Sequence, residues 1–123
     1  MIETAEEKGW DVDYYMTSLY FRTRTKDELR AIAGNDLPLG EIYLPSDPPK
    51  MFGAIKATSK PCIAYKLLAA GRRIGSPAEV RRCFEEAFAN IKDKDAAIVG
   101  MYQQFGDQVG EDSALVREIA SRR

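Results

Sequence analysis

The sequence predicts an α/β fold in which parallel strands alternate with helices. Patterns typical of helices and of strands follow one another along the chain. The later strands, residues 62–68 and 95–102, are nearly continuous apolar runs, as expected for a parallel sheet covered by helices. We expect right-handed crossover connections to set neighbouring strands side by side.

Length and composition are those of one globular domain spanning residues 1–123. The chain has 45% hydrophobic and 30% charged residues, which is ordinary for a globular protein. Its 18 basic and 19 acidic residues nearly cancel, so we expect neither a nucleic acid nor a membrane as partner. Because no apolar run is long enough to span a bilayer and the first residues are too acidic for a signal peptide, we expect a cytoplasmic location.

The content of histidine and cysteine limits the chemistry. The chain has no histidine, which excludes Ser-His-Asp and Cys-His catalysis and histidine-ligated zinc. Cys62 and Cys83 form neither a disulfide framework nor a zinc motif, and we expect both to be buried small hydrophobes. No metal site is predicted, and the sequence assigns no cofactor. Any reaction must therefore use Lys, Asp, Glu, Tyr, Arg, backbone amides or a bound ion.

Strand signals in the first half are less regular. Ile2 and Ala5 suggest a short opening helix that Gly9 ends, and the aromatic and β-branched residues 12–20 predict a strand. Residues 40–44 form a second, shorter strand candidate within an irregular excursion of the same domain.

Three helix starts carry capping signals. Thr25 and Ser76 each precede a glutamate at the capping-box spacing, and Asp47 precedes a proline that suits a first helical turn. Gly34 is placed to end the helix that begins after Thr25. Apolar residues then recur at helical spacing after each start and in a last helix. The residues expected to face inward are Leu29, Ile32 and Ala33, then Met51, Phe52 and Ile55, then Val80, Cys83, Phe84, Ala87, Phe88 and Ile91, and finally Leu115, Val116, Ile119 and Ala120.

Lys66 is the most informative single residue. It lies in the second half of the strand 62–68, and a lysine there must be neutralised, paired or placed at the mouth of a site, because a lone buried charge costs several kcal/mol. Strand alternation puts Cys62, Ala64, Lys66 and Leu68 on one face. We expect this smaller face to point inward and the bulkier residues between them to pack against helices.

Two segments resemble the last strands of (β/α)8 TIM-barrel proteins, in the style of aldo/keto-reductase-like and uncharacterised barrel families. These segments are Lys66-Leu67-Leu68-Ala69-Ala70-Gly71-Arg72 and Ala97-Ile98-Val99-Gly100-Met101. Since a full barrel needs about 250 residues, the resemblance implies the C-terminal half, a half-barrel-like partial barrel. The catalytic set and the cofactor-phosphate ligands of aldo/keto reductases have no match here, so the resemblance implies architecture alone.

Two alternatives remain for Lys66. A desolvated lysine at the carboxyl end of a barrel strand could serve as a catalytic Schiff-base nucleophile or general base. It could equally form a structural ion pair, with Asp13 or Asp95 as candidate partners, or extend its amino group to solvent.

An anion-binding site is a second candidate. Gly71, Arg72 and Gly100 follow two consecutive strands, where barrels often bind phosphate. Arg22 and Arg24 would lie on the same rim, although loop arginines are commonly just solvated. The carboxylates Asp107, Glu111 and Asp112 are interpreted as capping and dipole partners of the last helix.

Two functional hypotheses follow. The first is a small-molecule enzyme, of lyase or oxidoreductase type, with an anionic substrate near Lys66 and the Gly71-Arg72 loop. The second is a non-catalytic oligomeric barrel fragment or interaction module. Either way, three or four parallel strands leave two unpaired edges and an uncovered face, so we expect a homo-oligomer.

Overall fold

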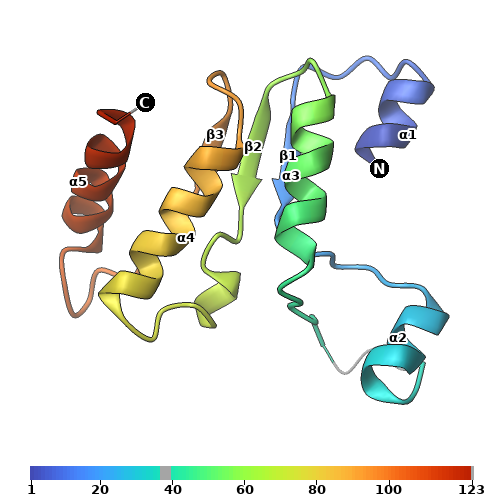
Figure 1. The fold of residues 1–123 in the computed structure, drawn as a ribbon, viewed down its shortest axis with the longest axis horizontal. Coiled ribbons are helices and arrows are strands. Elements are labelled where there is room, and N and C mark those ends of the chain that lie inside the picture. The colour runs from blue at the N-terminus through green and yellow to red at the C-terminus, as the bar shows by residue number, and fades with distance from the viewer. Residues whose placement is uncertain (37–39, 123) are drawn as a thin grey trace.

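The computed structural model describes residues 1–36 and 40–122, which form an α/β domain with a three-stranded parallel sheet (Figure 1). The strands β1 (Tyr15–Ser18), β2 (Cys62–Tyr65) and β3 (Ala96–Ile98) lie in the order β1-β2-β3. Around them lie α1 (Ile2–Glu7), α2 (Lys26–Ala33), α3 (Asp47–Ala57), the short 3-10 helix η1 (Ala69–Gly71), α4 (Pro77–Asn90) and α5 (Gln108–Ala120). The predicted alternation of parallel strands and helices is confirmed. Among the described helices, none has both the length and the apolar character needed to cross a bilayer.

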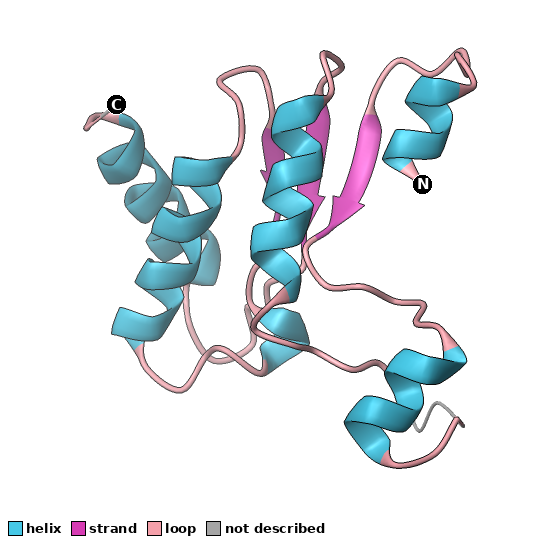
Figure 2. Ribbon diagram, turned by 45° about the vertical axis from the view of Figure 1, so that its right-hand side comes forward, coloured by secondary structure: helices cyan, strands magenta, loops and turns pink. Residues whose placement is uncertain are grey.

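One face of the sheet is covered by α3 and α4. Cys62 and Ala64 are completely buried on this face, in a core that includes Phe52 and Ile55 of α3 and Ala87 of α4. Figure 2 shows α3 lying across the strands, with α4 beside it. Since small strand residues let a helix approach closely, the bulk of this core comes from the helices.

The expected orientation of β2 is therefore wrong. Cys62 and Ala64 pack against the helices, whereas Ile63 and Tyr65 lie on the opposite face and are only partly buried. The prediction assumed that the bulkier face would meet the helices. Side-chain size on a strand does not decide this, because Phe52 and its neighbours on the helices fill the space above small residues.

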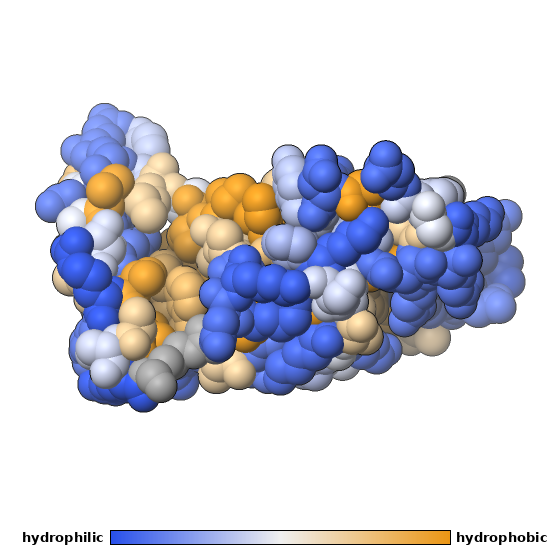
Figure 3. All heavy atoms as spheres, turned by 90° about the horizontal axis from the view of Figure 1, so that it is seen from above, coloured by the Kyte–Doolittle hydropathy of each residue, from blue (hydrophilic) through white to orange (hydrophobic). Residues whose placement is uncertain are grey.

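The opposite face of the sheet is largely exposed. Met16 is 55% exposed and Ile98 is 50% exposed, and both point away from α3 and α4 by the pairing of the strands. Figure 3, seen from above, shows further apolar residues in the hollow between α5, at the left, and the centre of the molecule. The fold thus presents an apolar surface that no described element covers.

The helix starts agree with the sequence better than the strand ends do. Thr25 forms the predicted capping box with Glu28, Ser76 accepts a hydrogen bond from the Glu79 amide, and Gly34 adopts the left-handed conformation at the end of α2. All three strands are shorter than predicted, and residues 40–44 form no strand.

The start of α3 differs from the prediction in one respect. Ser46 occupies the capping position, and Asp47 is the first helical residue. The Asp47 side chain is 1% exposed and forms an ion pair with Arg24, whose side chain is 5% exposed. Asp47 therefore joins α3 to the segment that follows β1 through a buried ion pair. Because Arg24 is the partner in that pair, it is not free to bind an anion at the rim.

Candidate functional site

The carboxyl ends of β2 and β3 open onto a large cavity. In Figure 1 the strands point downward, and η1 and the starts of α4 and α5 lie at the same lower edge. The cavity has a volume of about 1290 Å³, and its lining includes Lys66, Gly71 and Gly100. Three of the four residues predicted for the site, drawn from two separate loops, therefore meet at one cavity. The fourth, Arg72, does not line it.

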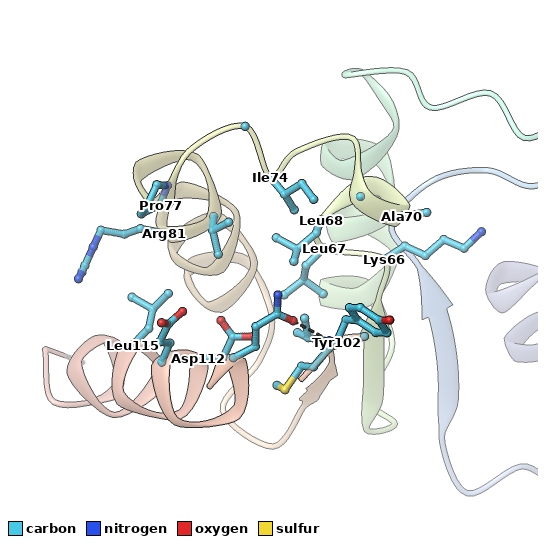
Figure 4. A pocket seen from close by; sticks show the side chains of 18 of the residues that line it. Lys66, Leu67, Leu68, Ala70, Ile74, Pro77, Arg81, Tyr102, Asp112 and Leu115 are labelled. Atoms are coloured by element: carbon cyan, nitrogen blue, oxygen red, sulfur yellow. Dashed lines mark hydrogen bonds between the residues drawn. The ribbon is translucent and has the colours of Figure 1, made fainter. Parts of the chain in front are cut away.

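The cavity lies between two helices. In Figure 4, Pro77 and Arg81 of α4 lie above Asp112 and Leu115 of α5, and Leu67 and Leu68 lie to the right of both helices. Most of its lining is apolar. The Arg81 guanidinium forms ion pairs with two residues that do not line the cavity, Glu118 at 2.8 Å and Glu85 at 3.7 Å. An apolar cavity with a few polar groups at its margin is the usual form of a small-molecule site.

The backbone that leads from β2 into η1 is unusual. Lys66, Ala69 and Ala70 have φ of 66°, 49° and 51°, and Gly71 has φ of 84°. Residues with a Cβ adopt this left-handed region at a cost of about 1–2 kcal/mol each. Such conformations are concentrated at functional sites, where the surrounding structure maintains them. Here they end β2 at Tyr65 and turn the Lys66 side chain away from the alternation of the strand.

Lys66 forms a structural ion pair, which was the second of the two alternatives predicted for it. Its Nζ lies 2.6 Å from Glu41 Oε2 and donates a hydrogen bond of 3.2 Å to the Tyr43 hydroxyl. The side chain is 19% exposed, and Figure 4 shows it leaving the cavity on the side opposite Arg81. The expected partners are wrong. Asp95 instead pairs with Lys92 and accepts the Cys62 amide, because it lies at the amino end of β3, and Lys66 turns toward Glu41 rather than Asp13.

Two arginines join this pair. Arg22 Nε lies 3.3 Å from the Glu41 carboxylate, and the Arg72 guanidinium carbon lies 4.1 Å from the centre of the Tyr43 ring. We call Arg22, Glu41, Tyr43, Lys66 and Arg72 the rim cluster. It brings three cations to one carboxylate and one aromatic ring. Arginine stacked on an aromatic face keeps its hydrogen-bonding edge available for an anion.

The rim cluster shifts the pKa values of its members. The hydrogen bonds from Lys66 and from Tyr43 lower the pKa of Glu41 to about 2. Burial by itself lowers the pKa of Lys66, but the hydrogen bonds to Glu41 and Tyr43 together outweigh it and raise that pKa above the usual lysine value. Lys66 is therefore a cation at neutral pH, and its amine is not free to act as a nucleophile or base in this arrangement.

The buried pair of Arg24 and Asp47 holds the segment that carries Glu41. Arg24 Nη2 donates a hydrogen bond of 3.2 Å to the carbonyl of Ile42 and contacts the Asp47 carboxylate. Because Ile42 lies between Glu41 and Tyr43, this contact fixes the backbone from which both side chains reach Lys66. Arg24 was predicted as a rim residue, and the structure gives it this supporting position.

Glu41, Tyr43 and Asp112 were not among the predicted site residues. Asp112 lines the cavity, and burial together with the charge of Glu111 raises its pKa above the usual aspartate value. It was interpreted only as a dipole partner of α5, and Asp107 is the residue that caps this helix, through the Gly110 amide. Glu41 and Tyr43 lie in the excursion between α2 and α3, where no local pattern marks a site.

Metal binding and similarity to other proteins add no further assignment. Within residues 1–36 and 40–122, no group of three or more cysteines and carboxylates is placed to hold a metal ion. A scan against protein families, a search of curated proteins and a search of solved structures each find no match.

Proposed function

We propose that this protein is a small-molecule enzyme, of lyase or oxidoreductase type, that acts on an anionic substrate. The substrate occupies the cavity at the carboxyl ends of β2 and β3, beside Gly71 and Gly100, and its negative group binds near Lys66 and Arg72. The observation that carries this proposal is the meeting of an apolar cavity with the cationic rim cluster at one edge of the sheet.

The architecture supports the same location. Strands in the order β1-β2-β3 with α3 and α4 on one face are compatible with part of a β/α barrel, whose interior would be the exposed face. Barrel enzymes place their sites at the carboxyl ends of the strands. We therefore propose that the domain is a half barrel and that the cavity is its active site.

The charges divide the roles between the residues. Lys66 stays protonated, so its role in the proposed reaction is to bind and polarise the negative group of the substrate. Asp112 lines the cavity, and burial raises the pKa of its carboxyl group, so we propose it as the group that exchanges a proton with the substrate.

Substitution of Lys66 tests the proposal. In a screen of anionic metabolites, the wild-type protein should show saturable binding or turnover, and Lys66→Met should lower kcat/KM or affinity by at least about tenfold, the value of one charged hydrogen bond. Lys56→Met is the matched control, since Lys56 is an exposed lysine on α3 that contacts only Asn90 among the hydrogen bonds described. Unchanged activity in a folded Lys66→Met protein would exclude Lys66 from the site.

A second candidate function is a non-catalytic, self-associating barrel fragment or interaction module. The exposed face around Met16 and Ile98 favours it, because a parallel sheet with one uncovered apolar face gains stability from a second layer. It predicts no turnover across a broad panel of substrates, and a free energy of unfolding that Lys66→Met leaves unchanged or raises.

A further inference from the structure

We propose that Glu41 is an internal competitor for an anion site formed by Lys66, Arg22 and Tyr43, and that the phosphoryl group of a small organic monoester displaces its carboxylate. This inference rests on the proposed function and specifies its substrate class. It follows from the charges of the rim cluster, the contacts of Glu41 and the cavity beside Lys66.

The charges of the rim cluster do not balance. Arg22, Lys66 and Arg72 each carry a positive charge, and Glu41 is the only carboxylate within the cluster as defined. The cluster therefore keeps an excess of two positive charges. A phosphate monoester carries about 1.5–2 negative charges at neutral pH, so it compensates this excess better than the single carboxylate does.

The contacts of Glu41 are those of a bound anion. Its carboxylate receives the Lys66 ammonium at 2.6 Å, the Arg22 guanidinium at 3.3 Å and the hydroxyl of Tyr43. All three donors come from side chains that reach one point from different segments: the loop after β1, the excursion before α3 and the end of β2. The oxygens of an incoming phosphoryl group can accept the hydrogen bonds from Lys66 and Tyr43 and form the ion pair with Arg22.

Displacement of Glu41 leaves the rest of the site in place. The exposed Glu41 side chain can turn to solvent, while Arg24 continues to hold the Ile42 carbonyl and Asp47. Tyr43 stays packed against the core and in tilted contact with the Tyr20 ring, with 5.0 Å between ring centres. The exchange therefore gives up the contacts of a partly exposed ion pair, and water compensates much of that loss at an exposed carboxylate.

The neighbouring cavity indicates an organic ester rather than free phosphate. Lys66 belongs both to the rim cluster and to the cavity lining, and Gly71 and Leu68 extend that lining beside it. Because the Lys66 side chain leaves the cavity, a phosphoryl group at its Nζ lies outside, and the organic substituent has to extend back along the lysine to reach the largely apolar lining. We therefore expect an apolar substituent to add affinity.

Isothermal titration calorimetry with phenyl phosphate and with inorganic phosphate tests the inference. We expect the wild type to bind phenyl phosphate more tightly than inorganic phosphate. Glu41→Gln should bind phenyl phosphate about two- to fivefold more tightly than the wild type, because the ester no longer has to break a partly exposed ion pair. Lys66→Met should bind phenyl phosphate at least about tenfold more weakly than the wild type. Asp27→Asn removes the same charge from an exposed pair with Arg30 on α2, away from the cavity, and should bind like the wild type.

The wild-type protein provides an independent readout. Saturating phenyl phosphate should raise the pKa of Glu41 from about 2 toward its usual value of 4.5, because the bound ester takes over Lys66. A 13C NMR titration of the Glu41 carboxyl measures this shift without any substitution. A Glu41 pKa that stays near 2 in the presence of bound ester would overturn the inference.

The outcomes separate this inference from the proposed function. If Lys66→Met loses binding but Glu41→Gln binds no more tightly than the wild type, Glu41 is not a competitor, and the proposed anionic site stands. If inorganic phosphate binds as tightly as phenyl phosphate, the monoester assignment is wrong. If binding is insensitive to Lys66→Met, or if neither the wild type nor Glu41→Gln binds either probe, the phosphate site itself is contradicted.

Discussion

Lys66 shows how a charge can follow directly after a buried strand. Its ammonium leaves the apolar end of β2 and reaches Glu41 at 2.6 Å, so the charge is compensated rather than buried alone. A non-glycine residue with φ of 66° makes this possible, because the side chain no longer follows the alternation of the strand. The position of the amino group thus depends on backbone conformation as much as on residue type.

Titration of Glu41 gives a prediction at this scale. Because its pKa in the folded protein is lowered from 4.5 to about 2, the stability that its pairing adds is fully present above about pH 4.5 and disappears as the pH falls through about 2. We expect 13C NMR to show the low midpoint in the wild type and a return toward 4.5 in Lys66→Met. A wild-type midpoint near 4.5 would show that the ion pair does not form in solution.

At the scale of elements, local signals predicted the helices and failed for the strand ends. Ser76 and Glu79 mark the start of α4 within four residues, so this start can be predicted without contacts from other parts of the chain. The end of β2 depends on left-handed Lys66, Ala69 and Ala70, and neither lysine nor alanine favours that conformation. Contacts of the whole fold impose it, and a local pattern therefore could not predict it.

The left-handed turn makes a second prediction. Ala70 is exposed with φ of 51°, so Ala70→Gly loses little packing and removes the steric cost of a Cβ in this region. We expect a gain of about 0.5–1 kcal/mol in the free energy of unfolding, after the entropy cost of glycine. Ala114→Gly, at an exposed position within α5, should instead lose about 0.5–1 kcal/mol.

Urea denaturation of the two variants measures the difference. If Ala70→Gly were destabilised as much as Ala114→Gly, the left-handed conformation of Ala70 would be refuted.

At the scale of the whole molecule, the candidate site was predicted only in part. Lys66, Gly71 and Gly100 were predicted because strand ends in a parallel sheet share one edge, and this rule of topology brought them to one cavity. Glu41 reaches Lys66 from 25 residues away, and residues 40–46, which carry Glu41, form no helix or strand. Nothing local to Glu41 or Tyr43 indicates that contact, since the segment is held by Arg24, which follows β1 and pairs with Asp47 of α3.

Self-association is predicted at the same scale. The exposed face that carries Met16 and Ile98 should pair with a second copy, so light scattering should give a mass above the 13.8 kDa of one chain. Replacing both residues by lysine should shift the mass to 13.8 kDa with the fold retained. Ile32→Lys, at a 41% exposed position of α2, is the control and should stay associated. A well-folded wild-type monomer at micromolar concentration would contradict this prediction.

A crystal structure of the wild-type protein grown with phenyl phosphate tests the central claim most directly. The account predicts a phosphoryl group within hydrogen-bonding distance of Lys66 Nζ, the phenyl ring in the cavity beside Gly71, and the Glu41 carboxylate turned away. An ester bound elsewhere, with Glu41 still paired to Lys66, would contradict it.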